Sequence, residues 1–118
     1  MRRVPLRLLT VTMPGQIVPQ DISYADIIKT MLFFSKPGSG LPTEDLLRSF
    51  EVWGSIKSAS DAGKAEVLLE EVDWSALMAR LSGFVWGPLA AAAPGECVEL
   101  IDAIRKAERI NMNKESAT

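Results

Sequence analysis

The chain of 118 residues contains no histidine and only one cysteine, Cys97. Without histidine, the most common general base and the most common metal ligand of proteins are missing. This absence excludes catalytic triads built on histidine and zinc sites that need histidine or paired cysteines. A lone cysteine cannot form an internal disulfide, which is typical of a reducing compartment. We therefore expect a protein that is not an enzyme and that has neither a cofactor nor a metal site.

Long hydrophobic runs and a strong net charge are also missing. The apolar run at residues 31–34 is far too short to cross a bilayer. Arg7 interrupts the apolar start of the chain, and Pro14 and Gly15 end it, so the pattern does not favour an export signal. The net charge is only −2, whereas nucleic-acid-binding domains are usually clearly basic. These patterns predict a soluble, cytoplasmic protein with neither a membrane nor a nucleic acid as its favoured partner.

The beginning of the chain has the alternation of a β-hairpin. Residues 6–12 are rich in β-branched and apolar side chains, and apolar and threonine residues alternate at their end. Pro14 and Gly15 suit the centre of a type II turn, after which Ile17 and Val18 resume the apolar pattern. Residues 65–70 predict one more short strand. The sequence leaves open whether that strand pairs with the hairpin.

Four segments have the periodicity and start signals of helices. Ser23, Thr43 and Asp73 are residues that favour the position before a helix, and Pro94 favours the first position of one. The expected buried faces are Tyr24, Ile27, Ile28, Met31 and Leu32, then Leu46, Leu47, Phe50, Trp53 and Ile56, then Trp74, Leu77, Met78 and Leu81, and finally Cys97, Ile101 and Ile104.

These patterns define an α+β fold. We expect a single domain over residues 1–110, in which an N-terminal β-hairpin and one short strand pack with about four helices. Residues 111–118 have the composition of a flexible C-terminal tail.

The end of the first helix is apolar on every side. Phe33 and Phe34 widen its apolar stripe beyond what one buried face needs. The cover is either the chain's own connector around Trp86 or a partner protein, because large exposed apolar patches mark interaction sites. The predicted contact set is Met31, Phe33, Phe34 and Trp86.

Two charged clusters and the cysteine each allow more than one interpretation. The acidic cluster is a solvated face, a surface for a basic partner, or a site that binds a divalent cation or acts as acid and base, and it comprises Glu66, Glu70, Glu71 and Asp73. The basic residues near the two termini are a solvated face or, if the termini meet, a phosphate-binding patch, and they are Arg2, Arg3, Arg7, Arg105, Lys106, Arg109 and Lys114. Cys97 is a buried apolar side chain or a reactive thiolate at a helix start.

Residues 67–77, Val-Leu-Leu-Glu-Glu-Val-Asp-Trp-Ser-Ala-Leu, combine a strand, an acidic turn and a helix. Together with the segment Tyr-Ala-Asp-Ile-Ile at 24–28, they resemble small proteins encoded among phage head and tail genes. Such proteins commonly act as assembly, adaptor or host-interaction factors. The resemblance implies a non-enzymatic protein-interaction module that acts through its apolar helix patch, as a phage assembly or accessory factor or a minor virion protein. Its partner would be another protein chain, either a second copy in a homo-oligomer or a phage or host protein, in the host cytoplasm or the virion.

Three alternatives remain open at this point. The first is a phage regulator that inhibits a host or defence protein through the acidic strand–helix surface. The second is a nucleic-acid-binding module that uses the terminal basic patch. The third is an enzyme that uses carboxylates with lysine or arginine.

Overall fold

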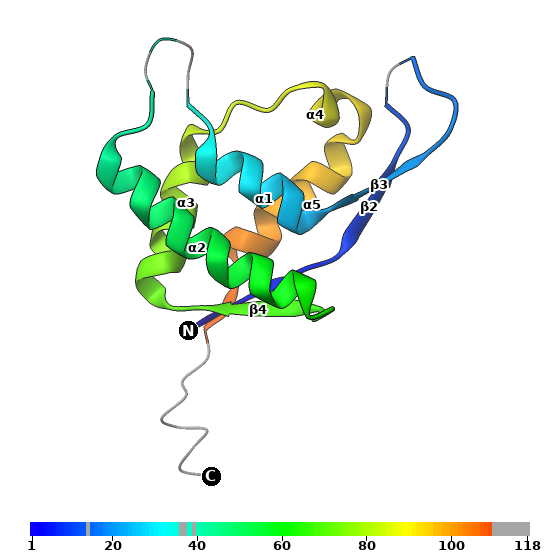
Figure 1. The fold of residues 1–118 in the computed structure, drawn as a ribbon. Coiled ribbons are helices and arrows are strands. Elements are labelled where there is room, and N and C mark those ends of the chain that lie inside the picture. Colours follow the sequence, from blue (N-terminus) through cyan, green and yellow to red (C-terminus); the bar gives the residue numbers. More distant parts are fainter. Residues whose placement is uncertain (14, 36–37, 39, 110–118) are drawn as a thin grey trace.

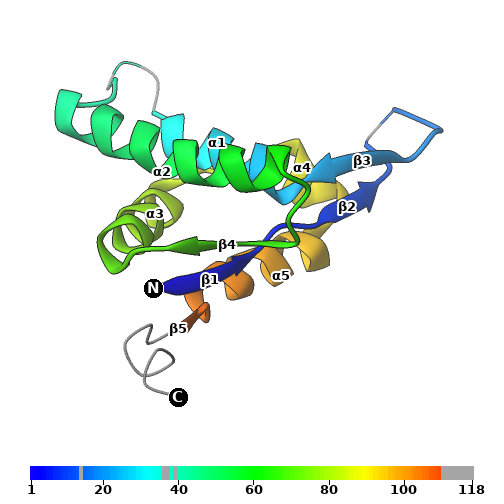
Figure 2. The same ribbon diagram turned by 60° about the horizontal axis from the view of Figure 1, so that its bottom comes forward.

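The N-terminal strand β1 (Arg2–Pro5) is the central strand of a three-stranded antiparallel sheet. It pairs with β4 (Glu66–Leu69) on one side and with β5 (Glu108–Arg109) on the other. Figures 1 and 2 show the computed structural model, which describes residues 1–13, 15–35, 38 and 40–109. One short sheet therefore joins the beginning, the middle and the end of the described chain.

The register of β1 explains how a proline fits in a central strand. The amide of Leu6 donates to the carbonyl of Ala65 at 2.8 Å, so every second residue of β1 bonds to β4. Val4 bonds to Val67 in this alternation, whereas the nitrogen of Pro5 points to the opposite side. On that side β5 pairs only with Arg2 and Arg3, so the missing N–H of Pro5 breaks no ladder bond.

The expected hairpin is present, but its second strand starts later than the apolar pattern predicts. β2 (Leu8–Val11) pairs with β3 (Gln20–Ser23), in a second, two-stranded sheet. The prediction of a strand at Ile17 and Val18 is wrong: both side chains are exposed in the connection, and pairing begins only after Pro19. A turn does follow Met13, whose carbonyl accepts the amide of Gln16 at 3.0 Å.

One residue of this turn has the conformation that the sequence predicted. Gly15 has a φ of 82°, the left-handed conformation that the third position of a type II turn requires. Pro14 and the predicted tail 111–118 lie outside the described residues.

Five helices complete the described structure, so the predicted α+β class is confirmed. They are α1 (Tyr24–Phe33), α2 (Thr43–Asp61), α3 (Glu71–Gly83), the short α4 (Pro88–Ala92) and α5 (Pro94–Arg105). Figure 2 shows α2 alongside β4, with β1 on the other side of that strand. The predicted pattern of α1 is confirmed, since Tyr24, Ile28 and Met31 are among its fully buried side chains.

Only one of the three predicted side-chain caps forms. The hydroxyl of Ser23 accepts the amide of Asp26 at 3.1 Å at the start of α1. The prediction for Thr43 is wrong, because Pro42 precedes α2 and Thr43 is already its first residue. The prediction for Asp73 is also wrong. The helix α3 begins at Glu71, two residues before Asp73, so Asp73 lies within its first turn.

The buried face of α2 differs from the predicted one. Its buried residues are Ser49, Val52, Ile56 and Ala59. The helix contacts α1, α3 and β4 at once, and short side chains allow all three to approach. The large apolar residues Leu46, Leu47 and Phe50 are therefore turned outward, where they are exposed.

The difference between the caps predicts a difference in stability. We expect Ser23→Ala to lower the free energy of unfolding by about 1 kcal/mol, because it leaves the amide of Asp26 without its acceptor. Thr43→Ala, the matched control, should change it by only a few tenths of a kcal/mol because Thr43 makes no cap bond. Urea denaturation followed by circular dichroism measures both values. Equal losses in the two variants would contradict the assignment of the caps.

Candidate functional site

The structure separates the four residues of the predicted contact set. Met31 is fully buried, so it belongs to the core and not to an accessible surface. Phe33, Phe34 and Trp86 are half-buried, and of these Phe33 and Trp86 pack against the core. The structure brings Phe34 and Trp86 together, but it places Phe33 toward another face.

The chain's own connector covers Phe34. The ring of Phe84 meets that of Phe34 edge to face at 5.3 Å and that of Trp86 at 5.0 Å. The guanidinium of Arg80 donates to the backbone carbonyl of Phe34. A groove of about 320 Å³ remains between α1 and the connector, lined by Ile27, Thr30, Phe34 and residues 84–89. This aromatic stack thus closes the end of α1 from within the chain.

Phe33 lies toward α2. The ammonium of Lys29 stands 5.2 Å from the centre of the Trp53 ring, which places these two residues on the shared outer side of α1 and α2. Phe33 is one helical turn after Lys29, and Phe50 is about one turn before Trp53. Because the two helices run in opposite directions (Figure 1), this spacing indicates that Phe33 is directed toward the half of α2 that contains Phe50.

The outer face of α2 is the largest accessible apolar feature of one helix in the described structure. Leu46 is 45% exposed, Leu47 54% and Phe50 67%. Leu47, Phe50 and Gly54 follow one another at spacings of three and four residues, so they form one stripe. We call Leu46, Leu47, Phe50 and Gly54 the α2 outer face. The sequence assigned its leucines and phenylalanine to the core, because periodicity identifies an apolar stripe but not what covers it.

Gly54 has no role within the described chain. A Cβ built on it would meet no atom within 4 Å, and its φ is not in the left-handed region. Glycine inside a helix costs about 1 kcal/mol relative to alanine, so its presence here weakens α2 without a packing reason. It leaves a notch in the stripe beside Leu47 and Phe50.

The two predicted charged clusters meet in the small sheet and pair with each other. Arg2 lies 3.0 Å from Glu71, and Arg3 lies 3.2 Å from Glu66 and 3.1 Å from Glu108. Alternation of both signs replaces the separate basic and acidic surfaces that the sequence suggested. Lys114 lies outside the described residues.

Further contacts make these charges part of the fold. Arg2 also stacks over the Trp74 ring at 4.1 Å and donates to the carbonyl of Ala107 at 3.1 Å. Asp73 lies 3.3 Å from Arg48 of α2. Arg2, Arg3, Glu66, Glu71 and Asp73 therefore have partners within the fold.

Cys97 is buried in α5, with 3% of its surface exposed. Burial raises the pKa of its thiol above the ordinary value of 9.0, and the neighbouring Glu96 carboxylate adds to this rise. The thiol is therefore neutral at physiological pH, which contradicts the reactive-thiolate alternative and agrees with a buried apolar side chain.

The described residues offer neither a metal-binding cluster nor a membrane-spanning helix. They contain no group of three or more histidine, cysteine, aspartate or glutamate residues that could hold a metal ion. None of their helices combines the length and the apolar character needed to span a membrane.

No protein-family model, curated protein sequence or solved structure is significantly similar to this chain. Its function is therefore inferred from its own surfaces.

The environment of Cys97 predicts slow alkylation and a loss of stability in alkali. Iodoacetamide should modify Cys97 at neutral pH only after unfolding in urea, as mass spectrometry would show. The folded thiol keeps its proton to higher pH than the unfolded thiol, so its contribution to stability is present below about pH 9 and is lost as pH rises further.

A cysteine-free variant provides the control. In Cys97→Ala the remaining alkaline loss of stability should come from Tyr24. Burial raises the pKa of Tyr24 above its ordinary value of 10.0, and Arg7 partly offsets this rise. The loss in the variant should therefore start at higher pH than in the wild type. Rapid alkylation of the native protein would show that Cys97 is not buried as described.

Proposed function

We propose that this chain is a non-enzymatic protein-interaction module that self-associates through the α2 outer face. The observation that carries the proposal is the exposure of Leu47 and Phe50 beside the notch at Gly54. Association would remove this apolar surface from water, which favours binding by roughly 25 cal/mol for each Å² buried.

The stripe has the geometry of a self-complementary surface. In a two-fold symmetric dimer, each residue of one patch meets its counterpart position on the other. Suppose that two α2 helices cross in opposite directions and that the two-fold axis of the dimer passes beside Phe50. Leu47 and Gly54 lie on either side of Phe50 along the helix. Leu47 of each copy therefore lies opposite Gly54 of the other. Each leucine then enters a notch, and the two Phe50 rings meet near the axis. A second copy therefore provides the shape that this surface lacks within one chain.

The resemblance to small phage head and tail proteins suggests the setting. Self-association through one helix would suit a particle-assembly or accessory factor, or a minor virion component. The absence of histidine and the neutral, buried Cys97 leave few groups for acid–base or nucleophilic catalysis, and so support a binding role over an enzymatic one.

Replacing Phe50 tests the surface directly. Phe50→Asp should yield a folded monomer, because it places two carboxylates at the axis of the dimer, where like charges would be desolvated together. Val98→Asp on α5 is the matched control, since Val98 is also an exposed helical residue, at 55%. Sedimentation velocity at two concentrations measures association, and circular dichroism verifies folding. The proposal is wrong if the wild type stays monomeric, or if Phe50→Asp and Val98→Asp associate equally well.

Gly54 allows a test in which stability and association change in opposite directions. Gly54→Ala should raise the free energy of unfolding of the monomer by about 1 kcal/mol, because alanine favours the helix and its Cβ meets nothing. The same methyl group partly fills the notch, so the dimer should dissociate at higher concentration than in the wild type. Denaturation at low concentration and sedimentation separate the two effects. Tighter association of Gly54→Ala would contradict the role of the notch.

A further inference from the structure

Within the described residues, the strand β4 has one edge that no other strand covers. It is the terminal strand of its sheet, because only β1 pairs with it. The register places the backbone bonds of Ala65, Val67 and Leu69 toward β1. The N–H and C=O groups of Glu66 and Leu68 therefore point to the uncovered edge, where they can accept an additional strand.

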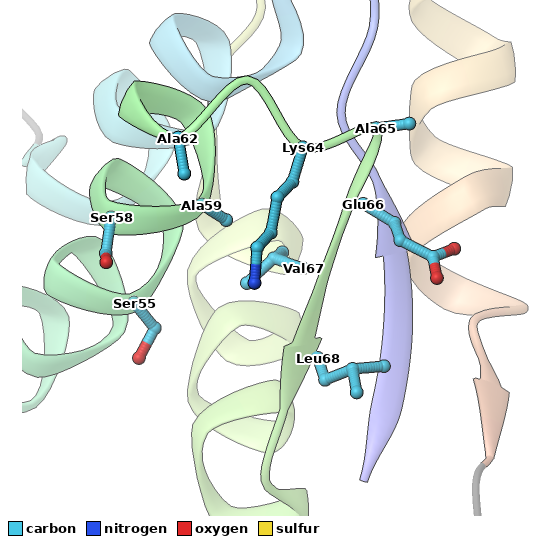
Figure 3. A pocket seen from close by; sticks show the side chains of 9 residues that line it. All are labelled: Ser55, Ser58, Ala59, Ala62, Lys64, Ala65, Glu66, Val67 and Leu68. Atoms are coloured by element: carbon cyan, nitrogen blue, oxygen red, sulfur yellow. The ribbon is translucent and has the colours of Figure 1, made fainter.

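A groove of about 680 Å³ runs between this edge and α2. On the helix side its wall consists of small residues, Ser55, Ser58, Ala59 and Ala62, which follow one another along one side of α2. Figure 3 shows Ser55 and Ala59 directed toward β4, whereas Glu66 and Leu68 point away from the helix. The groove thus combines free backbone groups on one side with short side chains on the other, so an extended chain has room to approach the strand.

Lys64 gives the groove its charge. Its side chain extends into the space between α2 and β4 (Figure 3). No ion pair or side-chain hydrogen bond of Lys64 occurs within the described part of the chain. Glu66 is already paired with Arg3 at 3.2 Å on the other side of the strand. An incoming segment therefore meets a positive charge without a partner.

We propose that this groove binds an extended, acidic segment of a partner protein, which joins the sheet as a strand next to β4. The main chain of the segment would exchange hydrogen bonds with Glu66 and Leu68, and an acidic side chain would pair with Lys64. This mode of recognition takes affinity from the main chain and specificity from alternate side chains. It goes beyond self-association, because it uses the backbone edge of β4 and a different class of ligand.

A second copy fits this edge less well than a single segment does. If two β4 strands paired edge to edge around a two-fold axis, their α2 helices would lie on the same face of the joined sheet, next to that axis. A single extended segment brings no such helix with it. The short side chains of α2 leave space for one strand beside β4.

The test uses two synthetic peptides with blocked ends. The first is Thr-Val-Thr-Asp-Thr-Val-Thr, and the second has lysine in place of aspartate. Amide spectra of the full chain are recorded during titration, and amide exchange is measured with and without peptide. We expect the aspartate peptide to bind more tightly and to slow exchange at Glu66 and Leu68.

Four variants show whether the binding uses the proposed groups. Lys64→Glu should weaken binding of the aspartate peptide by about threefold or more, and it should reverse the preference between the two peptides. Lys106→Glu, the same charge change at the exposed residue that follows α5, should leave the preference unchanged. Leu68→Pro removes an N–H that faces the open edge and not β1, so the fold should survive while binding is lost. Leu68→Thr keeps that N–H and should still bind.

The outcomes are decisive in both directions. Absence of binding, binding that leaves exchange at Glu66 and Leu68 unchanged, or equal binding by Leu68→Pro and Leu68→Thr would overturn the proposal. Slower exchange at these amides on raising protein concentration alone would show a second copy on the edge, and would overturn it too. Phe50→Asp should bind the peptide like the wild type, so failure of self-association and failure of peptide binding are separate results.

Discussion

The close approach of α2 to its neighbours is the constraint on which the rest of the structure depends. Ser49, Val52, Ile56 and Ala59 are the residues that it buries, and they let one helix contact α1, α3 and β4 together. The same rotation of the helix has two consequences. Its large apolar residues are turned toward solvent, and its small residues near the C-terminal end leave a groove along β4. Both proposed interaction surfaces therefore follow from how one helix is packed.

The second constraint is the sheet that joins distant parts of the chain. The strand β1 links β4 to β5, and its arginines pair with carboxylates on both neighbours. This arrangement uses charges of both signs for the fold, in a region where the sequence alone suggests two separate charged surfaces. The apolar outer face of α2 and the backbone edge of β4 both remain accessible. Recognition by this chain should therefore depend on shape and main-chain hydrogen bonds more than on long-range electrostatic attraction.

The sequence predicted the elements whose signals are local. The cap at Ser23 and the buried face of α1 are set by residues within one or two turns, and both were found. The strands β1 and β5 were missed because Arg2–Pro5 and Glu108–Arg109 become strands only by pairing with each other and with β4. The sequence placed the candidate apolar patch at the end of α1, whereas the exposed apolar stripe of the structure lies on α2. Periodicity cannot tell which of two faces of α2 a tightly packed core selects.

The central claim is that α2 leaves its apolar stripe outside the fold for a second copy to cover. Amide spectra of the labelled protein at low and high concentration test this claim residue by residue. We predict concentration-dependent shifts at Leu47, Phe50 and Gly54, with little change at Glu66 and Leu68. Spectra that are identical at both concentrations, or shifts confined to the edge of β4, would contradict it.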